Sequence, residues 1–241
     1  MTKMIRIGHI TPSSNTALEP LTYQMNRPYD SKVSHHFSRT GVTHLALAQS
    51  SEAQFQIEPM LAAARLLADA PLDLLVWNGT SASWRGLAND EALCAAITKE
   101  TGVPATTSTI GFYAAFQAFG WSRIGLALPY TADVSAEIEA EYVRRGYTVT
   151  ANACLGLREN RDIGAADPEA IRDVLRRAAA GNPDCIAVVC TNFNATELVD
   201  EMEAELGVPI VDSIAVTLWQ TLREVGVEVR IPGWGRVLSG A

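Results

Sequence analysis

Cys190 is the residue whose type and position most suggest chemistry. It follows the apolar run 185–189, and the polar residues Thr191 and Asn192 come directly after it. Such a run, with β-branched residues and no alternation, is typical of a strand in a parallel sheet covered on both faces. Open α/β sheets bind ligands beyond the carboxyl ends of these strands, where a helix N-terminus can also lower a thiol's pKa. Cys190 is therefore a candidate catalytic group. The alternative is a small buried core residue.

Alternating strands and helices are expected along the whole chain. The pattern predicts strands at 4–10, 33–37, 73–77, 104–108, 123–128, 148–155, 185–189 and 209–211. It predicts helices at 17–24, 51–70, 90–101, 110–119, 133–145, 167–180, 196–206 and 216–225. Asn194 and Glu197 have the spacing of an N-cap and its capping-box partner, Asp167-Pro168 is a strong helix start, and Pro59 predicts a kink or a delayed start. This alternation indicates parallel α/β layers.

Composition limits the class of protein. The chain has 241 residues, of which 48% are hydrophobic, so it can form one large domain or two small ones. A net charge of −8 argues against non-specific nucleic-acid binding and against binding to an anionic membrane surface. The four cysteines show neither metal-ligand spacing nor a disulfide framework. No signal peptide or transmembrane run is apparent, so we expect a cytoplasmic protein.

The sequence also contains a weak internal repeat. Arg6-Ile7-Gly8 with Pro12 matches Arg123-Ile124-Gly125 with Pro129, residues 73–80 match 184–191, and 103–120 match 208–226. The second match sets Gly79 opposite Cys190. The pattern predicts two pseudo-symmetric parallel-sheet α/β halves, one over 1–115 with a C-terminal return near 215–241 and the other over 116–214. The loops at Pro12, Gly79, Pro129 and Cys190 would then meet in a shared cleft, unless the matches only reflect the likeness of any two βα units.

Several segments resemble the maleate isomerase and arylmalonate decarboxylase branch of the aspartate/glutamate racemase superfamily. Residues 12–16 are similar to the N-terminal loop of the isomerase, and Pro129-Tyr130 is similar to a tyrosine-bearing loop of both enzymes. Residues 159–164 resemble an isomerase loop with a substrate-binding asparagine, and 232–240 resemble the C-terminal segment of both. The resemblance implies two α/β halves with the active site between them, a small carboxylic acid as substrate, no cofactor and a homo-oligomer.

Gly79 is where this chain departs from most of the family. Many members carry one cysteine in each half, and Gly79 occupies the position of the first. The stretch 79–86 resembles the loop of the decarboxylase, which also has glycine there. Cys190 matches the second cysteine. Cys94, Cys154 and Cys185 match no family position and are interpreted as packing residues.

A single thiol restricts the chemistry. Racemisation by two bases needs an acid and a base on opposite faces of a carbon. Cis–trans isomerisation in the family begins with addition of the first cysteine to a double bond, and that nucleophile is missing. Decarboxylation needs only an apolar place for the leaving carboxylate, donors that stabilise an enediolate, and one acid to protonate carbon. The sequence therefore favours a cofactor-independent decarboxylase with Cys190 as the acid.

Further site residues follow from the resemblance. Thr80, Ser81 and Tyr130 would form the carboxylate hole, with backbone N–H groups near Gly79, Thr191 and Asn192. Pro12, Asn15 and Asn160 match the isomerase, and the two amides would bind a carboxylate, which suggests a polar or aliphatic substrate. The alternatives are helix capping for Asn15, Thr80 and Ser81, packing for Tyr130 and a plain loop position for Asn160.

Three functions remain open from the sequence. The first is decarboxylation of a malonate-like small dicarboxylic acid. The second is isomerisation or racemisation, with Asn78 or a water replacing the missing cysteine. The third is a non-catalytic acid-binding protein. His9 is interpreted as a core residue, and His35 and His36 point to opposite faces of a strand, so no metal site is indicated. Trp84 and Trp234 either shape the pocket or anchor the packing.

Overall fold

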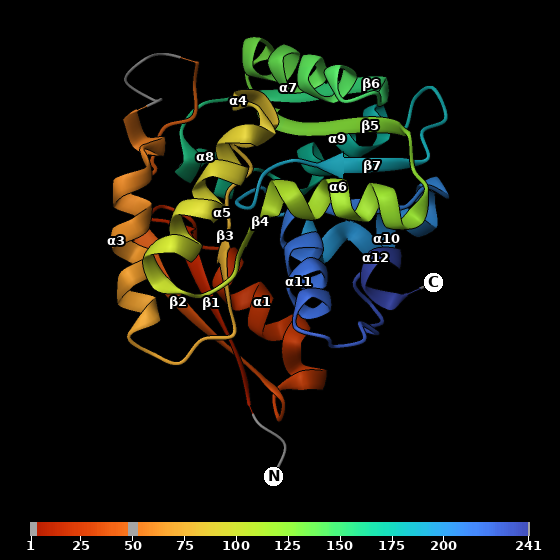
Figure 1. Cartoon of the computed structure of the whole chain (residues 1–241). Coiled ribbons are helices and arrows are strands. Elements are labelled where there is room, and N and C mark those ends of the chain that lie inside the picture. The colour runs from red at the N-terminus through yellow and green to blue at the C-terminus, as the bar shows by residue number, and fades with distance from the viewer. Residues whose placement is uncertain (1–3, 48–52, 241) are drawn as a thin grey trace.

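The computed structural model describes residues 4–47 and 53–240, which form two parallel four-stranded sheets. The first contains β1 (Ile5–Pro12), β2 (Val33–Thr40), β3 (Leu74–Trp77) and β4 (Ala105–Thr107), in the order β2-β1-β3-β4. The second contains β5 (Arg123–Tyr130), β6 (Thr148–Leu157), β7 (Cys185–Val188) and β8 (Ile210–Asp212), in the order β6-β5-β7-β8 (Figure 1). The two orders are equivalent, so the prediction of two similar α/β halves is confirmed.

The register of the central strands follows the sequence repeat. Ile7 of β1 pairs with Leu74 of β3, and Ile124 of β5 pairs with Cys185 of β7. The residue before each inner strand makes the same contact. The carboxylate of Asp73 accepts a 2.9 Å hydrogen bond from the N–H of Arg6, and that of Asp184 accepts a 2.8 Å bond from the N–H of Arg123. Every residue of β3 and β7 is buried, as continuous apolar runs require.

Helices cover both sheets. The first half carries α1 (Leu18–Asn26), η1 (Arg27–Tyr29), η2 (Ala53–Phe55), α3 (Ile57–Ala68), α4 (Ala82–Arg85), α5 (Leu87–Thr101) and α6 (Ser108–Phe119). The second carries α7 (Ala132–Arg144), α8 (Asn160–Gly164), α9 (Pro168–Ala178), η3 (Thr196–Leu198), α10 (Val199–Leu206), α11 (Ser213–Glu224) and α12 (Arg236–Ser239). Within the described residues, no helix has the length and apolar character needed to span a membrane.

Helices α6 and α11 join the two halves near the centre of the molecule (Figure 1). They follow the equivalent strands β4 and β8, and their first turns are capped by the side chains of Thr107 and Asp212. Gly111 allows a close approach, because a Cβ atom there would lie 3.3 Å from the carbonyl oxygen of Val216. The hydroxyl of Thr217 donates a 2.7 Å hydrogen bond to the hydroxyl of Ser108 across this contact.

Some local expectations were wrong. Asn194 does not cap a helix: its Nδ2 donates a 2.7 Å hydrogen bond to the carbonyl oxygen of Gly164, and no side chain caps η3. The Asn194 side chain therefore bonds to an acceptor distant in sequence instead of to the N–H groups at the start of η3. Pro59 marks a delayed start, since α3 begins at Ile57, while the expected start at Ser51 lies outside the described residues. Asp167 does cap α9, accepting a 2.7 Å bond from the N–H of Glu169.

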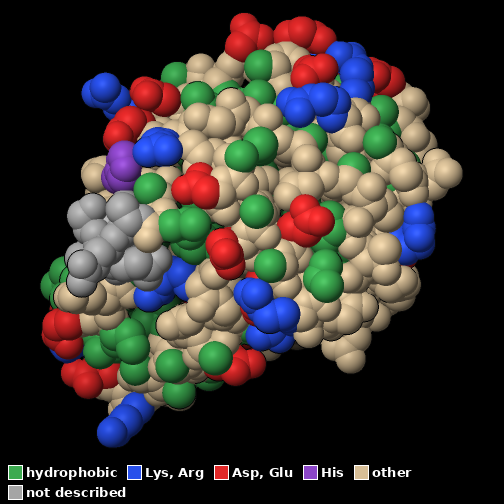
Figure 2. All heavy atoms as spheres, turned by 90° about the horizontal axis from the view of Figure 1, so that it is seen from above, with side chains coloured by type: hydrophobic (Ala, Val, Ile, Leu, Met, Phe, Trp, Pro, Cys, Tyr) green, Lys and Arg blue, Asp and Glu red, His purple; other side chains and the backbone are tan. Residues whose placement is uncertain are grey.

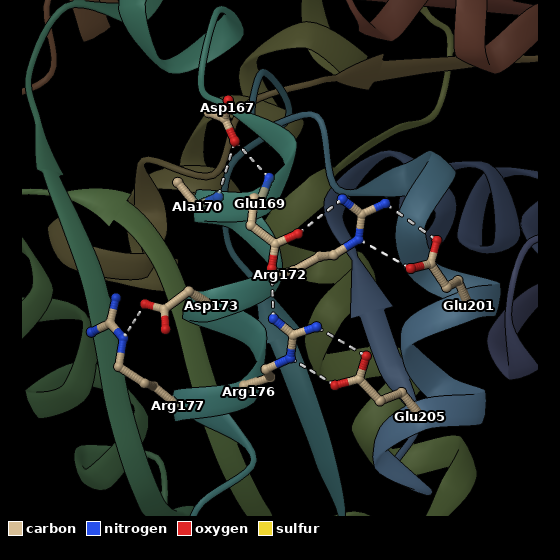
Figure 3. A network of polar contacts seen from close by, with 9 residues as sticks. All are labelled: Asp167, Glu169, Ala170, Arg172, Asp173, Arg176, Arg177, Glu201 and Glu205. Atoms are coloured by element: carbon tan, nitrogen blue, oxygen red, sulfur yellow. Dashed lines mark hydrogen bonds and ion pairs between the residues drawn. The ribbon is translucent and has the colours of Figure 1, made fainter.

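Exposed ion pairs tie α9 to α10 (Figure 3). The Nε atoms of Arg172 and Arg176 lie 3.0 and 2.7 Å from carboxylate oxygens of Glu201 and Glu205, and Glu169 also pairs with Arg176 at 2.8 Å. The two arginines and the two α10 glutamates are each four residues apart, so one face of each helix supplies the contacts. Elsewhere acidic and basic side chains are interspersed on the face drawn in Figure 2. Solvent and salt screen such pairs, so they orient α10 more than they stabilise the fold.

Candidate active site

A small cavity lies at the carboxyl ends of the central strands of both sheets. Its volume is about 30 Å³, which is room for about two water molecules. Both halves contribute to its lining, which consists of Pro12, Val42, Leu45, Phe55, Trp77, Gly79, Thr80, Ser81, Trp84, Tyr130, Asn160, Cys190 and Thr191. Among the described residues, no charged side chain lines it. A carboxylate here would be held by neutral donors alone.

Cys190 stands at the end of β7 with its backbone fixed. Its N–H donates a 2.8 Å hydrogen bond to the hydroxyl of Ser213, which in turn donates to the carbonyl oxygen of Val188. Burial raises the pKa of the Cys190 thiol, and the Tyr130 hydroxyl together with the N–H groups of Asn192 and Phe193 oppose that rise only in part. The group is thus a neutral thiol at neutral pH, able to donate a proton.

Tyr130 connects the thiol to the Gly79 loop. Its hydroxyl lies 3.3 Å from the hydroxyl of Thr80, and either oxygen can donate. Burial, followed by the neighbouring Cys190, raises the pKa of Tyr130 well above its ordinary value, so the phenol remains a donor. Its ring also packs edge-on against Trp84, with centroids 5.4 Å apart. Tyr130 therefore combines packing with a hydroxyl that lines the cavity.

Thr80 and Ser81 do not use their hydroxyls as helix caps. Helix α4 begins after Ser81, and no side chain caps it. The carbonyl oxygens of Thr80 and Ser81 instead accept bonds from the N–H groups of Ser83 and Trp84. Both residues are buried and line the cavity, where the Thr80 hydroxyl contacts that of Tyr130. The capping alternative for these residues is excluded.

Asn15 and Asn192 lie outside the lining. The Oδ1 atom of Asn15 caps the first turn of α1 by accepting 3.0 Å bonds from the N–H groups of Ala17 and Leu18. Its Nδ2 atom donates a 2.8 Å bond to the carbonyl oxygen of Thr191. The Nδ2 atom of Asn192 donates a 2.6 Å bond to the carbonyl oxygen of Asn160. The Oδ1 atom of Asn192 accepts a 3.2 Å bond from the N–H of Thr16, so both amides connect loops of the two halves.

Asn160 and Thr191 do reach the cavity. The Nδ2 atom of Asn160, at the start of α8, donates a 2.8 Å bond to the Ser14 hydroxyl. The hydroxyl of Thr191 donates a 3.0 Å bond to the carbonyl oxygen of Asn78. The side chain of Asn78 faces the other way, since its amide contacts Nδ1 of His9 at 3.1 Å. Asn78 is therefore not placed to serve as a second base.

Trp77 fills the space beside Gly79. A Cβ atom on Gly79 would lie 2.3 Å from two ring carbons of the Trp77 indole and 2.5 Å from its Nε1 atom. Trp77 ends β3 and Gly79 lies two residues beyond it, and these short distances place the indole directly over the glycine. No side chain fits at position 79 while the indole keeps this position. Trp77 was not predicted as a site residue, although a large side chain two residues before a glycine could have indicated this contact.

Buried imidazoles support the same loop. Nε2 of His9 lies 2.8 Å from Nδ1 of His35. Burial lowers the pKa of His9 well below its ordinary value and that of His35 to about 4, so both rings are neutral. The interpretation of His9 as a satisfied core residue agrees with these contacts. In the described part of the chain, no cluster of His, Cys, Asp and Glu has the arrangement of a metal site.

Comparison with known proteins gives a consistent set of similarities. A family model described as arylmalonate decarboxylase matches residues 8–238. The arylmalonate decarboxylase of Bordetella bronchiseptica is 30% identical over 187 aligned residues, covering 76% of this chain and 78% of that protein. The maleate isomerase of Geobacillus stearothermophilus is 24% identical over 253 aligned residues, which cover 100% of this chain and 99% of that protein. A mutant Nocardia farcinica maleate cis-trans isomerase, solved with a covalently bound succinylcysteine intermediate, shares the fold with a TM-score of 0.91 at 19% identity, covering 99% of this chain and 100% of that one.

Proposed function

Because this chain belongs to the arylmalonate decarboxylase family, we propose that it is a cofactor-independent decarboxylase of a malonate-like small dicarboxylic acid. It is an enzyme of the aspartate/glutamate racemase superfamily, and its relatives are decarboxylases and isomerases of small dicarboxylates. The observation that carries the choice of reaction is the asymmetry of the site. One thiol, Cys190, lies on one side, and an indole lies over a glycine on the other.

Neutral donors would bind the carboxylate that remains in the product. The hydroxyls of Thr80, Ser81 and Tyr130 line one part of the cavity. The N–H groups of Gly79, Thr80 and Ser81 make no hydrogen bond within the described residues, so they are available as well. Fixed donors in a buried site stabilise developing charge strongly, because they are already oriented when the charge appears.

The leaving carboxylate would lie against the apolar part of the cavity. Val42, Leu45 and Phe55 offer it no donor, which disfavours the charged group and favours neutral carbon dioxide. The bond between this carboxyl carbon and the α-carbon breaks, and its electron pair becomes part of an enediolate. The Cys190 thiol then gives its proton to the α-carbon, and the thiolate regains a proton from water. The sum is loss of carbon dioxide and gain of one proton from solvent.

NMR in D₂O tests this reaction. The purified protein would be given methylmalonate and other substituted malonates, with maleate and small α-substituted acids in parallel. We expect release of carbon dioxide and one deuterium on a single face of the product. Cys190→Ala should lose this activity, and Thr191→Ser, which keeps the loop hydroxyl, should retain it. Racemisation without release of carbon dioxide would contradict the proposal.

Isomerisation of maleate is the second candidate. The similarity that favours it is the match to a maleate isomerase over the whole chain. Because Gly79 replaces the cysteine that adds to the double bond in the family, Cys190 would have to act as the nucleophile instead. Its thiolate would add to the double bond and leave again after rotation, so the rate should rise as the thiol ionises. Conversion of maleate to fumarate by the wild type would support this candidate. A gain of racemase or isomerase activity only in Gly79→Cys combined with Trp77→Ala would support decarboxylation as the native reaction.

A further inference from the structure

Trp77 lies between two cavities. The reaction cavity of about 30 Å³ and a neighbouring cavity of about 360 Å³ share three lining residues, which are Phe55, Trp77 and Ser81. Of these, Trp77 has the largest side chain, and it is almost fully buried. The indole therefore belongs to the wall that separates a small site from a large one.

The position of the indole is fixed by what surrounds it. Trp77 ends β3, where it pairs with Ile10 of β1 and Thr107 of β4. Gly79 offers no side chain, which lets the ring lie directly over its backbone. The equivalent residue in the second half is Val188, whose side chain is much smaller. The two halves thus differ at two linked positions: tryptophan with glycine in one, and valine with cysteine in the other.

From this arrangement we infer that Trp77 determines the size of the substrate that the reaction cavity accepts. The inference rests on the proposed function, because it assumes a diacid bound between Thr80, Tyr130 and Cys190. Cys190 must reach one face of the α-carbon, so an α-substituent cannot lie between the thiol and that carbon. The space that remains for the substituent is bounded by the indole of Trp77. The cavity is small, so hydrogen or a methyl group requires less displacement of its walls than a phenyl ring, which would overlap the indole.

The larger cavity shows where a bulky group would go if the indole were absent. Besides the three shared residues, it is lined by Met60, Arg85 and Asn89 among others. Replacement of Trp77 by alanine would join the two spaces and place the new volume next to the α-carbon. The wild type is thus selective for small aliphatic diacids, and the selectivity depends on a single side chain.

Competition between two substrates tests the inference. We expect kcat/KM for methylmalonate to exceed that for phenylmalonate by at least tenfold in the wild type. Trp77→Ala should lower this ratio at least tenfold, and Trp77→Phe should give an intermediate ratio. Trp219→Ala, which removes a buried indole from α11 away from the cavity, should leave the ratio unchanged. Equal use of both substrates by the wild type, or an unchanged ratio in a folded Trp77→Ala protein, would overturn the inference.

A binding measurement separates this inference from the proposed reaction. Calorimetry with propionate and phenylacetate, the products expected from methylmalonate and phenylmalonate, needs no turnover, and the two acids differ in the same substituent. We expect the wild type to bind propionate at least tenfold more tightly than phenylacetate, and Trp77→Ala to remove that preference. If no diacid is decarboxylated but this pattern holds, the proposed function fails and the role of Trp77 stands. If neither acid binds to either protein, the role of Trp77 is wrong as well.

Discussion

The hydroxyl of Thr191 donates a 3.0 Å hydrogen bond to the carbonyl oxygen of Asn78. This bond joins the residue after Cys190 to the residue before Gly79, so it crosses directly between the two halves. Nδ2 of Asn15 reinforces it by donating a 2.8 Å bond to the carbonyl oxygen of Thr191. The loops that carry the thiol and the glycine are therefore held as one unit.

Thr191→Val should separate these loops without changing side-chain volume. It leaves a buried carbonyl oxygen without its donor, which costs about 1–3 kcal/mol in the free energy of unfolding. Urea denaturation would measure this loss, and kcat should fall as well because Cys190 loses its fixed position. Thr191→Ser keeps the hydroxyl and should recover both quantities. Equal stabilities for the valine and serine variants would show that the bond does not matter.

Tyr130→Phe should affect the reaction more than the fold. The phenyl ring keeps the contact with Trp84, but the hydroxyl near Thr80 and Cys190 is lost. Removal of one oxyanion donor typically costs roughly 2.7–4 kcal/mol, so kcat should fall by about 10²–10³ with a smaller change in KM. Steady-state kinetics with methylmalonate would check this. A change in KM alone would mean that the hydroxyl binds substrate without stabilising the enediolate.

The pH dependence of kcat identifies the state of Cys190. Burial raises the pKa of this thiol above its ordinary value of 9.0, so the proton-donating form persists through neutral pH. For decarboxylation we expect a flat profile at neutral pH and a fall only above about pH 9. A rate that rises with pH would instead indicate a thiolate nucleophile and favour isomerisation. The profile thus distinguishes the two candidate reactions with a single variable.

Asp212 should make the protein less stable as the pH rises. Burial raises the pKa of this carboxyl to about 6 from 3.8, and within the described residues its Oδ2 atom has no hydrogen-bond partner. The folded state holds its proton more tightly than the unfolded state, so stability decreases from about pH 4 to pH 6, by about 3 kcal/mol. Asp212→Asn keeps an oxygen for the cap of α11 and should remove this component. Urea midpoints of both proteins at pH 4.5 and 7 would measure it. If the urea midpoint changes by the same amount between pH 4.5 and pH 7 in both proteins, the expectation is wrong.

His35 should act in the opposite direction. Its pKa falls to about 4 in the folded state, chiefly through burial, whereas the unfolded value is near 6.5. The unfolded state binds the proton more tightly, so stability is lost as the pH falls from about 6.5 to 4, again by about 3 kcal/mol. His35→Asn should flatten this part of the profile in the same urea experiment. If the variant and the wild type differ by a constant amount at all pH values, the ring does not titrate as expected.

The sequence predicted the fold through patterns that depend on local periodicity. The apolar runs at 73–77 and 185–189 identified β3 and β7, and the repeated arginine and aspartate positions identified the two halves. Short helices were harder. Helices α4 and α8 lie in stretches interpreted as loops, because helices of only four or five residues carry little periodic signal. Asn194 showed that a tertiary acceptor can override a capping motif.

The site was predicted less completely than the fold. Thr80, Ser81, Tyr130, Asn160 and Cys190 meet at the cavity, as the loop positions suggested. The scaffolding role of Asn15 depends on a partner 176 residues away, which no local pattern reveals. The contact of Trp77 with Gly79 depends on a side-chain conformation. The roles of all these residues in catalysis remain predictions, as do the boundary near residue 115, the homo-oligomer and the cytoplasmic location.

The crossing of α6 and α11 has a consequence for how such a site can arise. The two helices occupy equivalent places in the two halves, so their contact has the geometry of a self-complementary interface between identical subunits. In a dimer of separate half-chains, one gene would specify both loops, and any residue opposite Gly79 would also be glycine. Fusion of the halves into one polypeptide removes that constraint. A thiol on one side and an indole over glycine on the other are available only to a chain that encodes each half separately.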